Sequence, residues 1–364
     1  MRRYFPIIPG DLCENISIGY EITRNCTLRC PYCYVTNRQH EGEELGKTDW
    51  LLLSQVLAKC LSGFNVHVNL SGGEIFVKDW VIEIIQYLLK KGIHVGIGTN
   101  GLHLPDVFLQ EDYFRNNKYF QIAISLDGSK PVHELTRTDF DTVSHNIESL
   151  IKTGVYTIVK TTAYQGNLKN ILELCKYLNH LGNKHNLVIP HEVQPALAGP
   201  RKEIKVDIQN FHSLKLILSE YIREGLYVTG YAKNHLKHIK SQWRFIGEVP
   251  ETQKRTMCLE SALFGCATGF GFDVMANGDI AACEMDLPMG NIKNKISEET
   301  LLNILDVLWK KMTPHQKCVP CQYKLYCGMC RLTPLMHGYT EGFGYDDCQM
   351  LMHDIFELIT AQKK

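Results

Sequence analysis

Short apolar segments alternate with amphipathic helix patterns from residue 16 to about residue 225. The apolar segments are rich in Val, Ile, Phe and Thr and end at Gly, Asn or Pro, which is typical of strands; they span 16–23, 66–70, 94–99, 120–126, 157–163 and 187–193. Helices are predicted over 49–61, 78–91, 105–115, 142–152, 168–181 and 207–224. Six strand–helix units in succession imply parallel strands joined by right-handed crossovers. The chain is therefore predicted to be an α/β protein whose sheet either stays open or closes partly into a barrel.

In either arrangement, catalytic side chains belong at the carboxyl ends of the parallel strands. After about residue 250 the alternation stops, and Cys, Gly, Pro and Tyr interrupt short irregular segments. Such a region lacks the periodicity that builds a large apolar core, so we expect inorganic cross-links to hold it together.

Charge and hydropathy exclude several classes of protein. Lys plus Arg and Asp plus Glu number 39 each, whereas nucleic-acid binders and polybasic membrane-surface proteins normally carry a basic excess. No apolar run approaches the roughly 18 residues of a transmembrane helix. The first residues lack the apolar core and the cleavage site of a secretory signal. We therefore expect a cytoplasmic protein that binds neither nucleic acid nor membrane.

Cysteine is unusually abundant, with fourteen residues in a chain of 364. Cytosolic thiols are kept reduced, so metal binding explains this abundance better than a disulfide framework does. Eleven of the fourteen fall into two groups, one near residue 30 and one from 258 to 348. Of the others, Cys60 and Cys175 lie in helix patterns, where a thiol usually packs as a small apolar side chain, and Cys13 receives no role.

The first group is a C-x3-C-x2-C loop formed by Cys26, Cys30 and Cys33 directly after the first strand. Three thiolates within eight residues can wrap one small soft site. A [4Fe–4S] cluster held by three cysteines has one iron without a protein ligand, which is then open to another molecule. A three-cysteine zinc site usually recruits a histidine, and the nearest is His40, so zinc remains an alternative.

This loop resembles the cysteine motif of the radical S-adenosylmethionine (radical SAM) superfamily. Gly72, Gly73 and Glu74 follow the second strand and are similar to the family's Gly-Gly-Glu segment, with Ile75 where Pro is common. The resemblance implies that this segment holds the amino group of SAM. Glycines let the backbone approach a ligand, and a glutamate offers negative charge to an ammonium group.

A second set of predicted SAM contacts comes from later strand ends. Ser125 and Arg137 resemble residues that grip the methionyl carboxylate or the ribose, and an Arg fork can bind a carboxylate through two parallel hydrogen bonds. By the same resemblance Tyr32 lies against the adenine, and Asn100 and Val193 belong to the same rim. The alternatives are a Ser-x-Asp-Gly turn with a solvated arginine, and an ordinary Asn-Gly turn.

The second cysteine group has the form C-x11-G-x4-C, then C-x2-C-x5-C-x2-C, then a last cysteine. It resembles the SPASM extension of radical SAM proteins, except that its last pair is C-x2-C where C-x3-C is usual. The resemblance implies two auxiliary [4Fe–4S] clusters, one on Cys258, Cys266, Cys283 and Cys330 and one on Cys318, Cys321, Cys327 and Cys348. Two structural zinc sites are the alternative, because C-x2-C pairs also suit zinc.

Glu284 directly follows Cys283. In the anaerobic sulfatase-maturating branch of the family, a carboxylate in this position removes a proton from the substrate. The resemblance therefore makes Glu284 a candidate general base. A solvated carboxylate beside Asp286 is the alternative.

The implied activity is reductive cleavage of SAM to a 5′-deoxyadenosyl radical, which abstracts hydrogen from a peptide or protein and so oxidises, cross-links or epimerises it. A flavodoxin or ferredoxin is the expected reductase. Two alternatives remain: the same chemistry on a small-molecule metabolite or cofactor precursor, or a non-catalytic iron–sulfur electron carrier. The resemblance implies a partial (β/α)6 barrel and an irregular iron–sulfur domain, with these divisions: an N-terminal extension 1–15, the barrel 16–230, a bridge 231–257, and a SPASM domain with a C-terminal helix 258–364.

Overall fold

A computed structural model describes most of the predicted barrel and part of the region that follows it. The described residues are 15–33, 35, 43–164, 166–187, 189–195, 228–229, 270–282 and 288–311. The predicted helix over 207–224, Glu284 and all eight C-terminal cysteines lie outside these residues.

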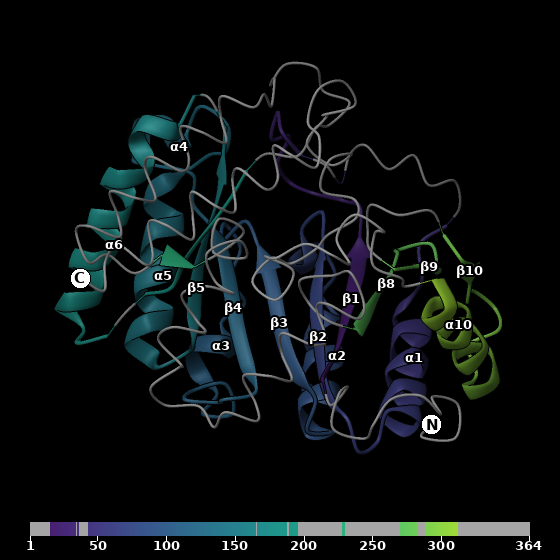
Figure 1. The fold of residues 1–364 in the computed structure, drawn as a ribbon. Coiled ribbons are helices and arrows are strands. Elements are labelled where there is room, and N and C mark those ends of the chain that lie inside the picture. Colours follow the sequence, from purple (N-terminus) through teal and green to yellow (C-terminus); the bar gives the residue numbers. More distant parts are fainter. Residues whose placement is uncertain are drawn as a thin grey trace, which may run out of the picture.

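The predicted parallel sheet is confirmed (Figure 1). Its six central strands lie side by side in chain order and pair in parallel: β1 (Asn15–Thr23), β2 (Asn65–Gly72), β3 (His94–Thr99), β4 (Phe120–Ser125), β5 (Thr157–Ala163) and β6 (His191–Pro195). The two-residue strand β7 (Val228–Thr229) extends the sheet beyond β6. Within the described residues the two ends of the sheet do not pair with each other, so the barrel is an open one.

Helices occupy the connections between the strands: α1 (Lys47–Cys60), the single turn η2 (Ile75–Val77), α2 (Val81–Lys90), α3 (Val107–Gln110), α4 (Lys130–His133), α5 (Phe140–Thr153), the turn η3 (Leu168–Asn170) and α6 (Ile171–Lys184). The prediction of a helix over 105–115 is wrong in length. α3 ends when Glu111 turns to an extended conformation, and the Arg115 side chain then bonds the carbonyl of Leu109. None of the helices in the described ranges is long and apolar enough to cross a membrane.

The two faces of the sheet differ in polarity. Alternate strand residues, such as Val66, Val68 and Leu70 on β2, are buried in one apolar core with the helices. The residues between them, such as His67 and Asn69, are polar and at least partly exposed. Sequential parallel strands with crossovers of one hand place every helix on the same side of the sheet. The opposite, polar face is thereby left for a ligand.

The sheet continues past the predicted end of the barrel. β8 (Phe270–Val274) pairs in parallel with β1, and β9 (Asp279–Ala281) and β10 (Gly290–Asn291) follow as antiparallel strands. Helix α10 (Glu298–Lys311) lies beside α1 and adds Leu301 and Leu305 to the same core (Figure 1). The described part of the region after residue 258 is thus built onto the barrel sheet.

His191 is fully buried at the start of β6. Its Nε2 lies 2.7 Å from the Thr161 hydroxyl, and that hydroxyl donates to the carbonyl of Leu126 at 2.5 Å. The Thr161 oxygen therefore accepts a hydrogen bond from Nε2–H, and no partner faces Nδ1 among the described residues. Burial lowers the pKa of His191 to about 4.

We expect this histidine to make the fold sensitive to acid. Between pH 6.5 and about 4 the unfolded chain binds the proton more readily than the folded one, so the free energy of unfolding falls as the pH falls. Between pH 7 and pH 5, His191 alone should lower the free energy of unfolding by about 2 kcal/mol. Urea denaturation at both pH values should show a smaller loss in His191→Gln than in the wild type, and an unchanged loss in the exposed-residue control His180→Gln. Equal losses in all three proteins would contradict this assignment.

Candidate active site

A cavity of about 220 Å³ opens where the first five strands end at their carboxyl termini. Its walls bring together nine of the eleven predicted site residues that the structure describes: Cys26, Cys30, Tyr32, Cys33, Gly72, Gly73, Asn100, Ser125 and Arg137. These residues are up to 111 positions apart in the chain, so only the folded sheet assembles them. The other two of the eleven are not among the lining: Val193 is fully buried on β6, and Glu74 is 1% exposed.

The cysteine loop leaves β1 and turns back within eight residues. The Cys33 amide donates to the Cys30 carbonyl at 3.1 Å, and the Leu28 amide donates to the sulfur of Cys26 at 3.4 Å. Burial raises the pKa of the Cys26 and Cys30 thiols, so a bound metal has to displace their protons. In the part of the chain that the structure describes, no three Cys, His, Asp or Glu side chains converge closely enough to hold a single ion.

This donor set fits a three-cysteine cluster. All three thiols face one cavity, and among its described lining residues there is neither a fourth cysteine nor a histidine. A closed structural zinc site needs four ligands around one ion, whereas a [4Fe–4S] cluster on three cysteines needs no fourth ligand from the protein. His40, the predicted fourth ligand of the zinc alternative, lies outside the described residues.

Gly72 and Gly73 hold the end of β2 against the cysteine loop. The Gly73 amide donates to the Thr23 carbonyl at 2.7 Å, and the Glu74 amide donates to the Asn25 carbonyl at 2.8 Å. A Cβ atom on Gly72 would lie 2.2 Å from the Thr23 oxygen, and one on Gly73 would lie 2.2 Å from the Asn25 oxygen. The backbone that these glycines allow to approach so closely is therefore that of the loop carrying the three cysteines.

The Glu74 carboxylate lies behind the cavity wall and joins two loops. It accepts hydrogen bonds from the Asn100 amide at 2.7 Å, from the Thr99 hydroxyl at 2.9 Å and from the Phe76 amide at 3.2 Å. Burial raises the pKa of Glu74, and these hydrogen bonds oppose the rise. Asn100 in turn donates from its side chain to Thr27, inside the cysteine loop. A contact between the Glu74 carboxylate and the SAM amino group stays a prediction.

Arg137 is not the solvated arginine of the alternative interpretation, because its side chain is only 11% exposed. Its Nε donates to the carboxylate of Asp127 at 2.7 Å, and its guanidinium lies over the Tyr32 ring at 5.6 Å. The Tyr32 hydroxyl donates to the same carboxylate, and the Tyr32 ring packs against Tyr164. No separate role is predicted for Asp127 from the sequence, where it is only part of a Ser-x-Asp-Gly turn. A contact between Tyr32 and adenine stays a prediction.

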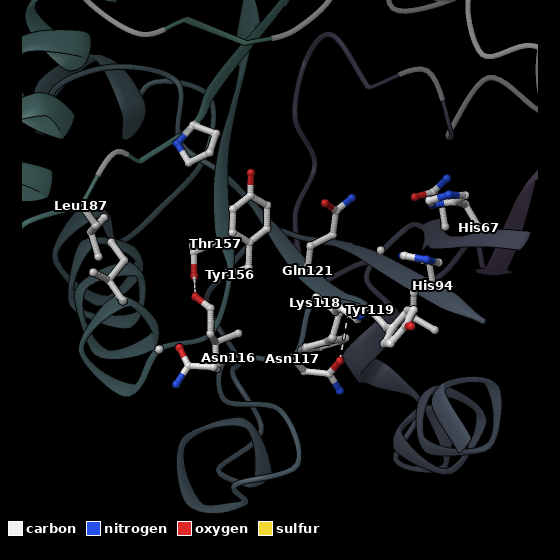
Figure 2. A pocket seen from close by; sticks show the side chains of 18 residues that line it. His67, His94, Asn116, Asn117, Lys118, Tyr119, Gln121, Tyr156, Thr157 and Leu187 are labelled. Carbon is white, nitrogen blue, oxygen red and sulfur yellow. Dashed lines mark hydrogen bonds between the residues drawn. The ribbon is translucent and has the colours of Figure 1, made fainter. Parts of the chain in front are cut away.

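A larger cavity, of about 630 Å³, lies at the opposite, amino ends of β2 to β5 (Figure 2). Its most distinctive feature is a pair of stacked rings, His67 and His94, with centroids 4.3 Å apart. Burial lowers the pKa of His67 to about 4 and lowers that of His94 as well, so both are neutral at pH 7. None of the predicted site residues lines this cavity. The chemistry therefore belongs to the smaller cavity at the carboxyl ends.

Comparisons with known proteins agree with the fold. The model of the Radical SAM superfamily matches residues 20–192. The chain is 23% identical over 345 residues to the antilisterial bacteriocin subtilosin biosynthesis protein AlbA of Bacillus subtilis strain 168, which covers 87% of this chain and 67% of that protein. It is 22% identical over 336 residues to the AdoMet-dependent heme synthase of Nitratidesulfovibrio vulgaris strain Hildenborough, which covers 86% of each.

Among solved structures, anSMEcpe with bound AdoMet and the Cp18Cys peptide shares the fold, with a TM-score of 0.64 at 16% identity over 95% of this chain and 98% of that one. The fold and the thiol-lined cavity define an α/β enzyme with a partial barrel. Residues 20–192 form a radical SAM domain. Such a domain implies a [4Fe–4S] cluster and SAM, and it does not support the interpretation as a non-catalytic electron carrier.

Proposed function

We propose that this enzyme reductively cleaves SAM and uses the radical to modify a peptide or protein. The observation that carries the proposal is the meeting of Cys26, Cys30 and Cys33 with the Gly72–Gly73 backbone and Arg137 around one cavity. When bound on the three cysteines, the cluster supplies the electron that cleaves SAM to a 5′-deoxyadenosyl radical, which then takes a hydrogen atom from the substrate.

The chain's own residues would bind and orient SAM in this cavity. Arg137 and Ser125 lie on the wall where they can take the methionyl carboxylate, and an arginine suits that group because its fork is planar. Gly73 and Glu74 would hold the amino group, and Tyr32 the adenine. Asn100, directly after β3, would complete the rim. Val193 is buried within β6 and does not line the cavity, so its place at the rim stays a prediction.

Further parts of the proposal rest on the sequence of the C-terminal region. Cys258, Cys266, Cys283 and Cys330 would hold one auxiliary [4Fe–4S] cluster, and Cys318, Cys321, Cys327 and Cys348 the other. Glu284 would remove a proton from the substrate. The proposed domains are an N-terminal extension over 1–15, the barrel over 16–230, a bridge over 231–257 and a SPASM domain over 258–364. Within the last of these, β8 to α10 pack onto the barrel sheet. A flavodoxin or ferredoxin in the cytoplasm would supply electrons.

A peptide substrate is supported by the relative named for bacteriocin biosynthesis and by the structural neighbour solved with a peptide. The polar face of the sheet also suits a peptide: Lys160 lines the cavity and pairs with Glu192 at 3.6 Å. Such groups can meet the charges and amides of a peptide chain. The AdoMet-dependent heme synthase supports the second candidate, the same radical chemistry on a small molecule.

Transfer of deuterium separates the two candidates. Cells grown in deuterated medium provide an extract that is divided into a peptide and protein fraction and a small-molecule fraction. Each is incubated with the reconstituted enzyme, SAM and dithionite, and mass spectrometry then measures deuterium in the 5′-deoxyadenosine. We expect deuterium from the peptide fraction, and none with a Cys26/Cys30/Cys33→Ala variant. Deuterium from the small-molecule fraction alone would exclude a peptide substrate.

A further inference from the structure

Asp127 is a fully buried carboxylate in the turn after β4, and the proposed function does not use it. Its Oδ2 accepts hydrogen bonds from Arg137 Nε at 2.7 Å and from the Tyr32 hydroxyl. Its Oδ1 accepts the Thr162 amide at 2.9 Å. A buried carboxylate is costly unless it is paired and hydrogen-bonded, and here three donors from three different segments satisfy it.

The backbone of Asp127 is held as firmly as its side chain. Its amide donates to Nδ1 of the buried His133 at 3.2 Å, and its carbonyl accepts from the Asn167 side chain at 2.9 Å. Both partners are fully buried. The backbone of Asp127 is therefore held by two groups that do not line the cavity, and this fixes the position from which its carboxylate extends.

For Arg137 the consequence is preorganisation. An arginine side chain has several rotatable bonds, and fixing them costs conformational entropy. Asp127 fixes the guanidinium through Nε, so the remaining N–H donors can bind a carboxylate without first losing that freedom. Burial lowers the pKa of Arg137, but the Asp127 charge, the nearby Tyr32 and Cys30 and the hydrogen bond to Asp127 together outweigh it and hold the pKa well above its usual value. The cation therefore persists beside the cavity.

Asp127 also holds the cysteine loop in place through its hydrogen bond with Tyr32. Tyr32 lies between Cys30 and Cys33, and burial followed by the Asp127 charge raises the pKa of its hydroxyl, which stays a proton donor. One carboxylate thus ties together the loop that carries the thiols, the arginine on the cavity wall and the end of β5.

We propose that Asp127 is a positioning residue that orients Arg137 toward the carboxylate of bound SAM and secures the cysteine loop through Tyr32. Asp127 does not touch SAM itself; it acts through these two side chains. The inference rests on the proposed function, because it assigns the SAM carboxylate to Arg137.

The test compares two ligands that differ only in that carboxylate. Equilibrium dialysis under anaerobic conditions measures the Kd of SAM and of decarboxylated SAM, with bound iron measured on every protein. In Asp127→Asn we expect SAM to bind about 10- to 100-fold more weakly, as for the loss of a charge-assisted hydrogen bond. Decarboxylated SAM should bind within about 2-fold of the wild type. The iron content should be unchanged, because an asparagine side chain still offers the Tyr32 hydroxyl an oxygen that accepts its hydrogen bond.

Two further variants make the result specific. Asp141→Asn removes an exposed carboxylate that pairs with Lys130 on the surface. It should leave the affinities for SAM and for decarboxylated SAM unchanged. Adding Asp127→Asn to an Arg137→Met protein should weaken SAM no further, because the first residue acts through the second. If Asp127→Asn does not fold, Arg137→Lys takes its place. Lysine keeps the positive charge but has no guanidinium, so it cannot donate to Asp127 through Nε and to the SAM carboxylate through the remaining N–H groups. It should show the same selective loss.

Equal weakening of SAM and decarboxylated SAM in Asp127→Asn would show a purely structural role and overturn the proposal. So would an unchanged preference for SAM in that variant, or in Arg137→Lys. A wild-type protein that holds iron and binds no SAM would overturn both this inference and the proposed function. A wild type that binds SAM but never cleaves it would contradict the proposed function alone.

Discussion

Replacing Cys26, Cys30 and Cys33 together with alanine should remove about four iron and four sulfide from each chain. Three [4Fe–4S] clusters require about 12 of each, and the loss of the N-terminal one leaves about 8. The reason is geometric: the three thiols face one cavity, whose described lining offers no other cysteine to replace them. The measurement is iron, acid-labile sulfide and zinc per chain after anaerobic reconstitution.

The matched control is Cys60→Ala together with Cys175→Ala. These thiols lie in α1 and α6, and neither lines the cavity, so their loss should leave iron and sulfide at the wild-type values. Zinc without sulfide in the wild type would contradict the cluster assignment. So would an iron content that the triple variant leaves unchanged.

Replacing Gly72 with alanine should unfold the protein or destabilise it by at least about 3 kcal/mol, because two costs add. Gly72 has a φ of +131°, a conformation that side chains rarely adopt. Its new Cβ would also lie 2.2 Å from the Thr23 carbonyl oxygen, which belongs to the backbone and cannot move aside alone. The strand end that carries the cysteine loop would have to shift, so iron binding should fall as well.

Gly92→Ala separates the two costs. Gly92 also has a positive φ, of +73°, but no atom lies within 4 Å of its added Cβ. Only the conformational cost remains, about 1 kcal/mol. Urea denaturation of the metal-free proteins compares the two variants with the wild type. If the Gly72→Ala protein is no less stable than the Gly92→Ala protein, Gly72 does not lie as close to the Thr23 carbonyl as the structure shows.

The sequence predicted those elements whose signal is local. The strands at 94–99 and 157–163 have the observed bounds, because each is a short segment with Val, Ile or Thr residues that lies between turn residues. The last strand begins at His191 instead of 187, just after Pro190, which has no amide to donate to a ladder. β8 was not predicted. Its five residues pair with β1, more than 250 positions away, and Gly271 is needed because its Cβ would meet Ser17.

The site shows the same division. The cysteines, the two glycines, Ser125 and Arg137 follow strand ends, so parallel topology alone predicts that they meet. Asp127 is not predicted as a site residue, because its importance comes from burial and from partners on other segments. Glu74 is predicted to bind SAM because of its Gly-Gly-Glu motif. The motif does not reveal that its carboxylate is buried and accepts a hydrogen bond from the Asn100 amide, because both depend on the neighbouring strand.

The central claim is that the site of Cys26, Cys30 and Cys33 cleaves SAM reductively, and the products of that cleavage test it most directly. The reconstituted protein is mixed anaerobically with SAM and dithionite, and 5′-deoxyadenosine and methionine are measured over time. We predict equal amounts of both from the wild type and neither from the Cys26/Cys30/Cys33→Ala variant. A wild type that carries its full iron and sulfide and forms no 5′-deoxyadenosine would contradict the claim.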